Sequence, residues 1–290
     1  MRREASSFTR YPSLPRLLLL GTGLHLLIAL LSYVAWIATG NDVWITSFFN
    51  YQGTLFFLLC DFIGFWVSLK IWRQLSPGDA MKPAWFLITL SFALRLSGDV
   101  LTHLLNLNSS LLGQVIGGPG AMLLLAGGLL LVLRVYRRLD MLARLAALDY
   151  MLVSAVTAYT IRFGYDLLGW QSEGPVSVLK AINWLSDPLL SLLLFEAIYI
   201  RRSVIRMGPG LISRCWGAFM AGIFFTSVGD MGLWAVAQGY LNWPQSSITW
   251  YVWFLASAAY TLGPAYQAQA MSRASEELAS YEREKRVEFA

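Results

Sequence analysis

Apolar segments of about twenty residues recur along this 290-residue chain, and they constrain its fold more than any other feature. An α-helix rises about 1.5 Å per residue, so such a segment crosses the roughly 30 Å apolar core of a bilayer. Hydrophobic residues make up 57% of the chain and charged residues only 13%, well below the charge content of soluble domains. These values exclude a soluble enzyme, a disordered regulator and a disulfide-stapled secreted domain. The sequence therefore predicts an all-α integral membrane protein, because a helix satisfies its backbone hydrogen bonds internally.

The pattern predicts eight transmembrane helices joined by short connections, which leave no room for a large soluble domain. The predicted spans lie at residues 15–38, 53–73, 84–105, 111–134, 147–170, 177–200, 214–238 and 247–269. The first apolar segment is longer than that of a signal peptide, so we interpret it as a retained span.

Basic residues fall almost entirely on one side of these spans. Nineteen of the 22 Lys and Arg residues precede the first span, follow spans two, four and six, or follow the eighth. By the positive-inside rule, this asymmetry predicts that both termini are cytoplasmic. The net charge of +5 then reflects loops that face anionic lipid, and we expect no nucleic acid partner.

The two halves of the chain carry similar motifs in corresponding spans. Span three contains Gly-Asp at 98–99, span seven contains Gly-Asp at 229–230, and spans two and six each contain one aspartate. Coincidence is one explanation, and we favour two tandem, parallel four-helix repeats. The predicted order is a cytoplasmic N-terminus at 1–14, repeats at 15–138 and 147–269, and a cytoplasmic helical tail at 270–290.

Seven charged residues are predicted in the outer half of the bundle, where buried charge is costly and often functional. They are Asp61, Arg95, Asp99, Arg162, Asp166, Asp187 and Asp230. Arg95 with Asp99, and Arg162 with Asp166, have the i,i+4 spacing of neutralising pairs on one helix face. We expect a polar layer that binds a ligand, a cation or protons. The structural alternative is that these aspartates cap backbone or bond side chains on other helices, as the Asp187-Pro188 pair indicates.

No motif for catalysis or metal binding is found in the sequence, which lacks GxSxG, HExxH and P-loop patterns. The two cysteines lie in apolar segments, and the two histidines are predicted at depths too different to ligate one haem. We therefore expect no enzyme activity, no metal and no resident cofactor; a bound lipid, quinone or pigment stays open. The Gly-Gly-Pro-Gly run at 117–120 predicts a kink or a close helix contact.

The last twenty residues are rich in Glu, Arg and Ala, which predicts a helix. Met271, Ala274, Leu278 and Tyr281 follow 3–4 spacing, which is typical of a seam for another helix. We interpret this seam as a contact for a protein partner or a second copy; the alternative is a solvated tail.

Four short segments carry a family resemblance. They are Ala-Leu-Arg-Leu-Ser-Gly-Asp-Val at 93–100, Leu-Asp-Tyr-Met-Leu-Val at 148–153, Leu-Ser-Asp-Pro-Leu-Leu at 185–190 and Gly-Asp at 229–230. Over residues of about 50–270 the chain resembles the eight-span N-terminal sensory module that precedes diguanylate cyclase, phosphodiesterase or histidine kinase domains in bacterial signalling proteins. The resemblance implies an inner-membrane input module that perceives a signal and passes it through a cytoplasmic helix.

No such output domain is present in the 290 residues. We therefore expect a non-enzymatic, sensor-like or accessory subunit that acts through a partner. The alternatives are a small transporter or proton-coupled carrier, and a structural subunit of a larger membrane complex.

Overall fold

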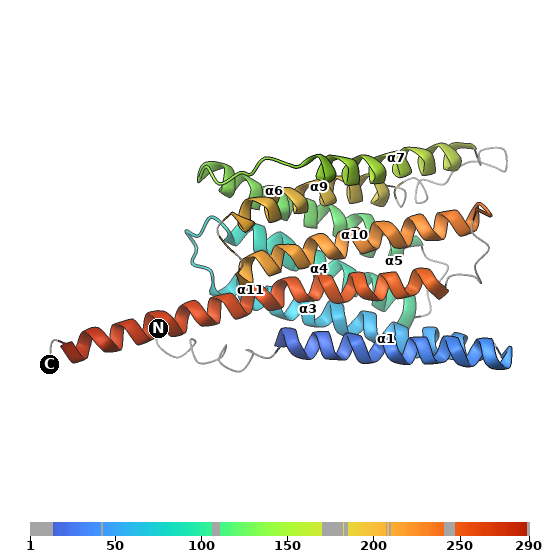
Figure 1. Ribbon diagram of the computed structural model, residues 1–290, viewed down its shortest axis with the longest axis horizontal. Helices are drawn as coiled ribbons and strands as arrows, with labels where there is room; N and C mark the ends of the chain where they lie inside the picture. Colours follow the sequence, from blue (N-terminus) through green and yellow to red (C-terminus); the bar gives the residue numbers. More distant parts are fainter. Residues whose placement is uncertain are drawn as a thin grey trace.

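The computed structural model describes residues 14–41, 43–105, 111–169, 182, 185–206, 208, 210–240 and 247–288, at some positions by the backbone alone, and every element in these ranges is helical (Figure 1). The long helices are α1 (Leu14–Thr39), α3 (Thr54–Gln74), α4 (Lys82–Asp99), α6 (Ala121–Arg138), α7 (Ala147–Gly169), α9 (Ser186–Ile205), α10 (Leu211–Ala237) and α11 (Ser247–Glu288). The short ones are α2 (Val43–Ser47), α5 (Leu111–Val115) and the π-helical turns η2 (Phe48–Gly53), η3 (Val100–Leu104) and η4 (Ile116–Gly120).

Five helical segments in the described ranges are long and apolar enough to cross a bilayer, which identifies a multi-pass membrane protein. They are Leu14–Thr39, Tyr51–Gln74, Lys82–Thr102, Leu112–Arg138 and Leu211–Val236. These segments coincide with predicted spans one to four and seven. The other three predicted spans overlap α7, α9 and α11, whose crossing of the membrane stays a prediction, as does the orientation of the chain.

The helix α9 begins at Ser186, where Pro188, which lacks an N–H, fits the first helical turn. The predicted start of this span at 177 lies outside the described residues. The helix α11 continues through the predicted tail to Glu288 without a break, although it contains Pro264. Its 42 residues span about 63 Å, and its C-terminal part extends beyond the bundle (Figure 1).

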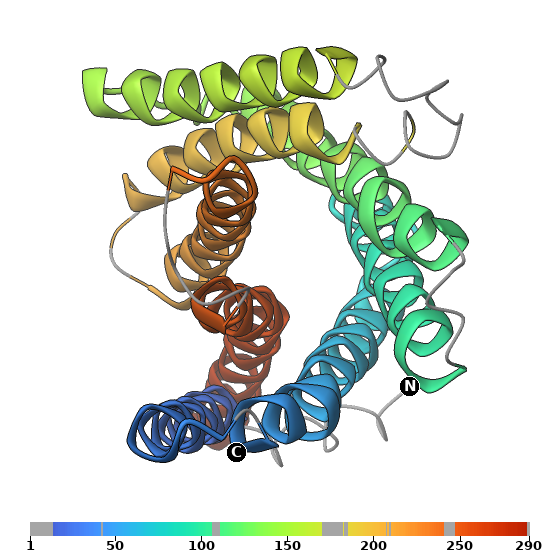
Figure 2. The same ribbon diagram turned by 90° about the vertical axis from the view of Figure 1, so that its right-hand side faces the viewer.

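Six helices close into a ring, which Figure 2 shows along the bundle axis. In this ring α3 packs against α4, α4 against α6, α6 against α9, α9 against α10, α10 against α11, and α11 against α3. The helix α1 lies outside the ring on α11, where the Tyr251 hydroxyl donates to the Ala29 carbonyl over 2.7 Å. The helix α7 lies outside the ring on α9. The predicted repeats, which are not tested by this arrangement, would each supply three helices.

An aromatic layer fills the ring near the end from which the tail of α11 emerges. Trp85 of α4 packs against Trp216 and Phe219 of α10, with ring centroids 5.6–6.5 Å apart. All three side chains are at most 1% exposed. Most of the basic residues lie at this end, which we call the basic end.

Candidate functional site

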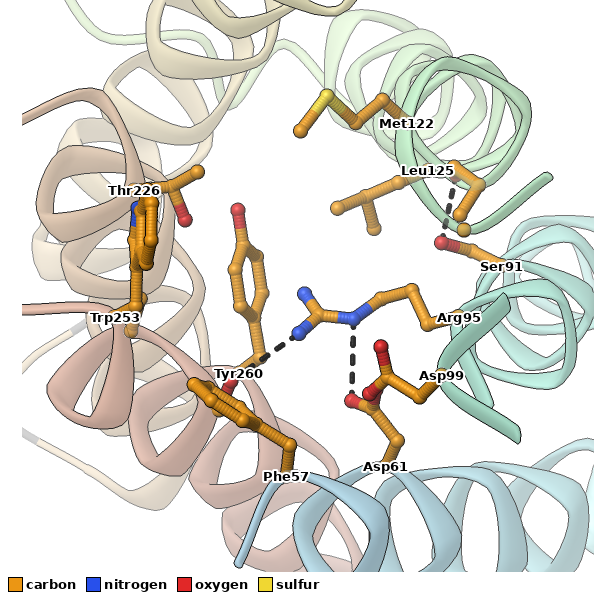
Figure 3. A pocket seen from close by; sticks show the side chains of 14 residues that line it. Phe57, Asp61, Ser91, Arg95, Asp99, Met122, Leu125, Thr226, Trp253 and Tyr260 are labelled. Atoms are coloured by element: carbon orange, nitrogen blue, oxygen red, sulfur yellow. Dashed lines mark hydrogen bonds and ion pairs between the residues drawn. The ribbon is translucent and has the colours of Figure 1, made fainter. Parts of the chain in front are cut away.

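A cavity of about 210 Å³ lies inside the ring, on the side of the aromatic layer away from the basic end (Figure 3). Side chains from α3, α4, α6, α10 and α11 line it, so both halves of the chain contribute. Its polar and aromatic lining consists of Phe57, Asp61, Ser91, Arg95, Asp99, Thr226, Trp253, Ser257 and Tyr260.

The Arg95 guanidinium lies across this cavity and joins three helices. Its Nε donates to Asp61 Oδ1 of α3 over 3.1 Å, and its Nη2 donates to Ser257 Oγ of α11 over 3.4 Å. Its Cζ lies 4.6 Å from the centroid of the Tyr260 ring, which is cation–π distance. The Asp61 side chain is 1% exposed and that of Arg95 is 23% exposed. A buried carboxylate and a guanidinium in this geometry stabilise each other, and losing either leaves an uncompensated charge.

Asp99 lies with Asp61 and Arg95 in one charged group, but it does not form the ion pair with Arg95 that the i,i+4 spacing predicts. The i,i+4 pattern predicts that Arg95 pairs with Asp99 of its own helix, whereas the structure pairs Arg95 with Asp61. The Asp99 carboxyl lies beside that of Asp61, facing the cavity (Figure 3). Two carboxyl groups and one guanidinium leave one formal negative charge. A shared proton or a cationic ligand would neutralise it.

Glycines bring the backbone of α4 close enough to η4 to place Asp99 here. A Cβ on Gly98 would lie 2.6 Å from the Gly117 Cα, so the two backbones are in direct contact. About two turns before Gly98 along α4, the Ser91 hydroxyl donates a hydrogen bond to the Ala121 carbonyl over 2.7 Å. The close helix contact predicted for the Gly-Gly-Pro-Gly run is therefore confirmed.

The second pair of predicted aspartates lies outside the cavity lining. Asp230 Oδ1 accepts from the Trp253 Nε1 over 3.0 Å, and Asp187 Oδ1 accepts from the Tyr159 hydroxyl over 3.4 Å. Asp187 and Asp230 are close enough to interact electrostatically. The Trp253 indole therefore separates this pair from Asp61 and Asp99. The four aspartates form two groups rather than the single layer that the sequence predicts.

The structure does not bring the second predicted ion pair to the cavity. Arg162 is exposed on α7, which lies outside the ring, and the Asp166 side chain lies outside the described part of the structure. The i,i+4 spacing fixes which face two residues share, but it says nothing about whether their helix joins the ring.

The predicted partner-binding seam divides at the edge of the bundle. Met271 packs against the hydrophobic core of the ring. Ala274, Leu278 and Tyr281 are exposed, and the last two side chains are 61% and 55% exposed. The seam open to a partner is therefore shorter than the sequence predicts.

Sequence reasoning missed the neutral residues of α11 that form one wall of the cavity. Trp253, Ser257 and Tyr260 follow i,i+4,i+7 spacing, which places them on one helix face. A matching signal lies in α10, where a Cβ on Gly222 would contact the Tyr260 ring and a Cβ on Gly229 would contact the Trp253 ring. Two glycines seven residues apart, facing two large aromatics seven residues apart, would have indicated this helix pair.

The cavity thus combines charged, hydroxyl and aromatic side chains. Among the residues that the structure describes, no group of three or more His, Cys, Asp and Glu side chains is placed to hold a metal ion. Comparisons with protein-family models, with curated proteins and with solved structures find no match.

Proposed function

We propose that this chain is a non-enzymatic, sensor-like or accessory membrane subunit that binds a small ligand in the cavity around Arg95. The observation that carries this proposal is the position of Arg95, whose charge is held inside the ring beside open space. A purely structural ion pair would be packed on all sides, because interior voids cost stability. Here the guanidinium instead faces a cavity with hydroxyls and aromatic rings around it.

The lining favours a small organic cation that carries a hydrogen-bond donor. Asp61 and Asp99 outnumber Arg95 by one formal charge. The rings of Phe57 and Trp253 offer faces that attract cations. A volume of about 210 Å³ is below the 300–1,000 Å³ typical of sites for drug-sized ligands, so the ligand would be small.

The same contacts provide a route from the cavity to the tail. Ser257 and Tyr260 lie on α11, and this helix continues unbroken to Glu288. A ligand that displaced the Arg95 guanidinium from these two residues would change how α11 packs against α3 and α4. In thermodynamic terms the ligand would shift the population between two packings of α11. The exposed residues Leu278 and Tyr281 would carry that shift to a protein partner or a second copy.

The charge distribution supports an inner-membrane protein whose basic end faces the cytoplasm. In that orientation both termini are cytoplasmic and the cavity lies in the outer half of the membrane. The ligand would reach the site from outside the cell, and the response would emerge at the cytoplasmic tail.

A carrier is the second candidate, because carriers place substrate sites between two internal repeats and this cavity is lined from both halves of the chain. The aromatic layer of Trp85, Trp216 and Phe219 counts against it, since it closes the route to the basic end. Uptake of radiolabelled amines into proteoliposomes, compared with empty liposomes, distinguishes the two functions. Saturable uptake would favour the carrier.

Gentle purification at native expression, followed by mass spectrometry of small molecules, tests the binding proposal. Three proteins are compared: the wild type, Asp99→Asn, and Asp140→Asn, which removes one exposed carboxylate at the basic end. We expect a stoichiometric small molecule with the wild type and Asp140→Asn that is absent from Asp99→Asn, because the cavity then loses its excess negative charge. The same small-molecule content in all three would contradict the proposal.

A further inference from the structure

A second polar hollow lies on the outside of the ring, at the basic end. It has a volume of about 450 Å³ and is formed by the first three turns of α10 with one side chain each from α9 and α11. Arg201, Ser213, Arg214 and Tyr266 supply its polar lining. Ala218, Met220 and Ala221 continue the lining along α10. The groove therefore passes from charged to apolar within about 12 Å along the helix axis.

The consecutive residues Arg201 and Arg202 at the end of α9 make different contacts. Arg202 forms a bidentate ion pair with Asp149 of α7, through N–O distances of 2.9 and 2.8 Å. Arg201 instead lies across α10, with its Nε 3.4 Å from the position of a Cβ on Gly217. The absence of a side chain at Gly217 gives the guanidinium a path into the groove.

Neither guanidinium of the groove forms an ion pair with a residue that the structure describes, although Arg201 is near enough to Asp149 to interact with it electrostatically. The ion pairs found there join Arg95 to Asp61 and Arg202 to Asp149. Arg201 and Arg214 also make no hydrogen bond to a described residue. The Asp149 carboxylate is already ion-paired with Arg202, so an anion in the hollow would be attracted by both Arg201 and Arg214 and would reduce the repulsion between them.

We propose that this groove binds the phosphate diester of an anionic phospholipid from the cytoplasmic leaflet. The planar donor fork of arginine matches phosphate oxygens, and basic pockets between helices at the cytoplasmic side are suited to such headgroups. The apolar continuation over Ala218, Met220 and Ala221 would receive the start of an acyl chain. Free phosphate has no apolar group to contact that part of the groove, so an amphipathic ligand fits the whole lining better.

Lipid retention measured by native mass spectrometry tests this assignment. The protein is reconstituted in nanodiscs that contain equal amounts of phosphatidylglycerol and phosphatidylcholine, and the lipids that stay bound after release are counted. The double variant Arg201→Gln/Arg214→Gln is compared with Arg137→Gln/Arg138→Gln, which removes the same charge from exposed positions at the end of α6. Ala218→Phe fills the groove without any change of charge. Thermal melting in detergent checks that each variant is folded.

The wild type and the α6 variant should each retain phosphatidylglycerol in preference to phosphatidylcholine. We expect the groove variants to lose that preference, with the affinity for phosphatidylglycerol about 30-fold lower for the double variant, since two guanidinium–phosphate contacts are removed. Equal retention by the groove and α6 variants would overturn the proposal. If millimolar inorganic phosphate displaced the lipid and raised the melting temperature as much as phosphatidylglycerol, the ligand would be free phosphate and the lipid assignment would be wrong.

Discussion

The Arg95 side chain determines both the stability and the chemistry of the cavity. It is held by one carboxylate, one hydroxyl and one aromatic ring, each from a different turn of α3 or α11. Because the Asp61 carboxylate is buried, its removal leaves a positive charge in a poorly solvated place. Asp99 lacks such a bond to Arg95 and is the better candidate for direct contact with a ligand.

Replacing Asp61 should therefore destabilise the protein much more than replacing Asp99. We expect Asp61→Ala to lower the free energy of unfolding by about 3 kcal/mol, the usual loss when one partner of a buried ion pair is removed. Asp99→Ala should cost less than half as much. The midpoint of thermal unfolding in detergent measures both. Asp140→Asn is the control, because Asp140 is exposed with a φ of 55°, a conformation that Asn accepts. Equal losses for Asp61 and Asp99 would contradict the pairing.

The contact between Gly98 and Gly117 makes a second prediction about single residues. Gly98→Ala places a methyl group against the η4 backbone, so we expect a loss of about 2 kcal/mol from overpacking. Gly23→Ala in α1 is the matched control, since a Cβ there meets nothing within 4 Å. That control should be neutral or slightly stabilising because Ala favours a helix. Comparable unfolding midpoints for the two variants would show that the close contact is not needed.

The helix α7 is held to α9 by a specific polar contact at the basic end. Asp149 accepts both bonds from Arg202, and its Oδ2 also accepts from the Ala146 N–H over 2.7 Å at the start of α7. The helix lies outside the ring, so its attachment can change without opening the cavity.

Asp149→Ala should loosen the start of α7 and leave the ring intact. We expect a local loss of roughly 2 kcal/mol, reduced from that of a fully buried pair because the Arg202 side chain is 37% exposed. Hydrogen exchange should become faster at residues 141–152, with no change in α3, α4 or α11. If exchange instead rose throughout the ring, α7 would have to be part of the core.

The tail of α11 makes a prediction about association. Leu278 is the most exposed large apolar side chain of the seam. A charged side chain at this position should prevent a partner helix from packing against it. We expect Leu278→Glu to abolish co-elution of the second chain, whether a copy or another protein. Ser280→Glu, which lies on another face of the same helix, should leave it in place. Size-exclusion chromatography with light scattering gives the mass. Loss of association in both variants, or in neither, would argue against the seam.

The sequence predicts where the helices of this fold lie along the chain much better than it predicts which helices pack against one another. The ends of α1 and α10 follow from apolar length and from glycines at 40 and 239, whose φ values of 65° and 73° end a helix. The partner of Arg95 could not be predicted, since the i,i+4 rule compares residues only within one helix, and Asp61 arrives from α3 through the packing of the ring.

For the whole molecule, the important asymmetry is between the two ends of the ring. One end is filled by Trp85, Trp216 and Phe219, and the other half holds the Arg95 cavity. A sensor-like subunit needs access from one side only, whereas a carrier must open to both. The two functions therefore differ in which sides of the membrane have access to the cavity.

Labelling of a cysteine at position 226 tests this most directly. Thr226 lines the cavity and is partly exposed, while the native Cys60 and Cys215 are buried. A small membrane-impermeant thiol reagent is added to intact cells or to inverted inner-membrane vesicles that carry Thr226→Cys. We predict labelling in intact cells, protection by the small molecule that co-purifies with the wild type, and no labelling in inverted vesicles. Labelling from the cytoplasmic face, alone or together with the outer face, would contradict an outward-facing sensory cavity.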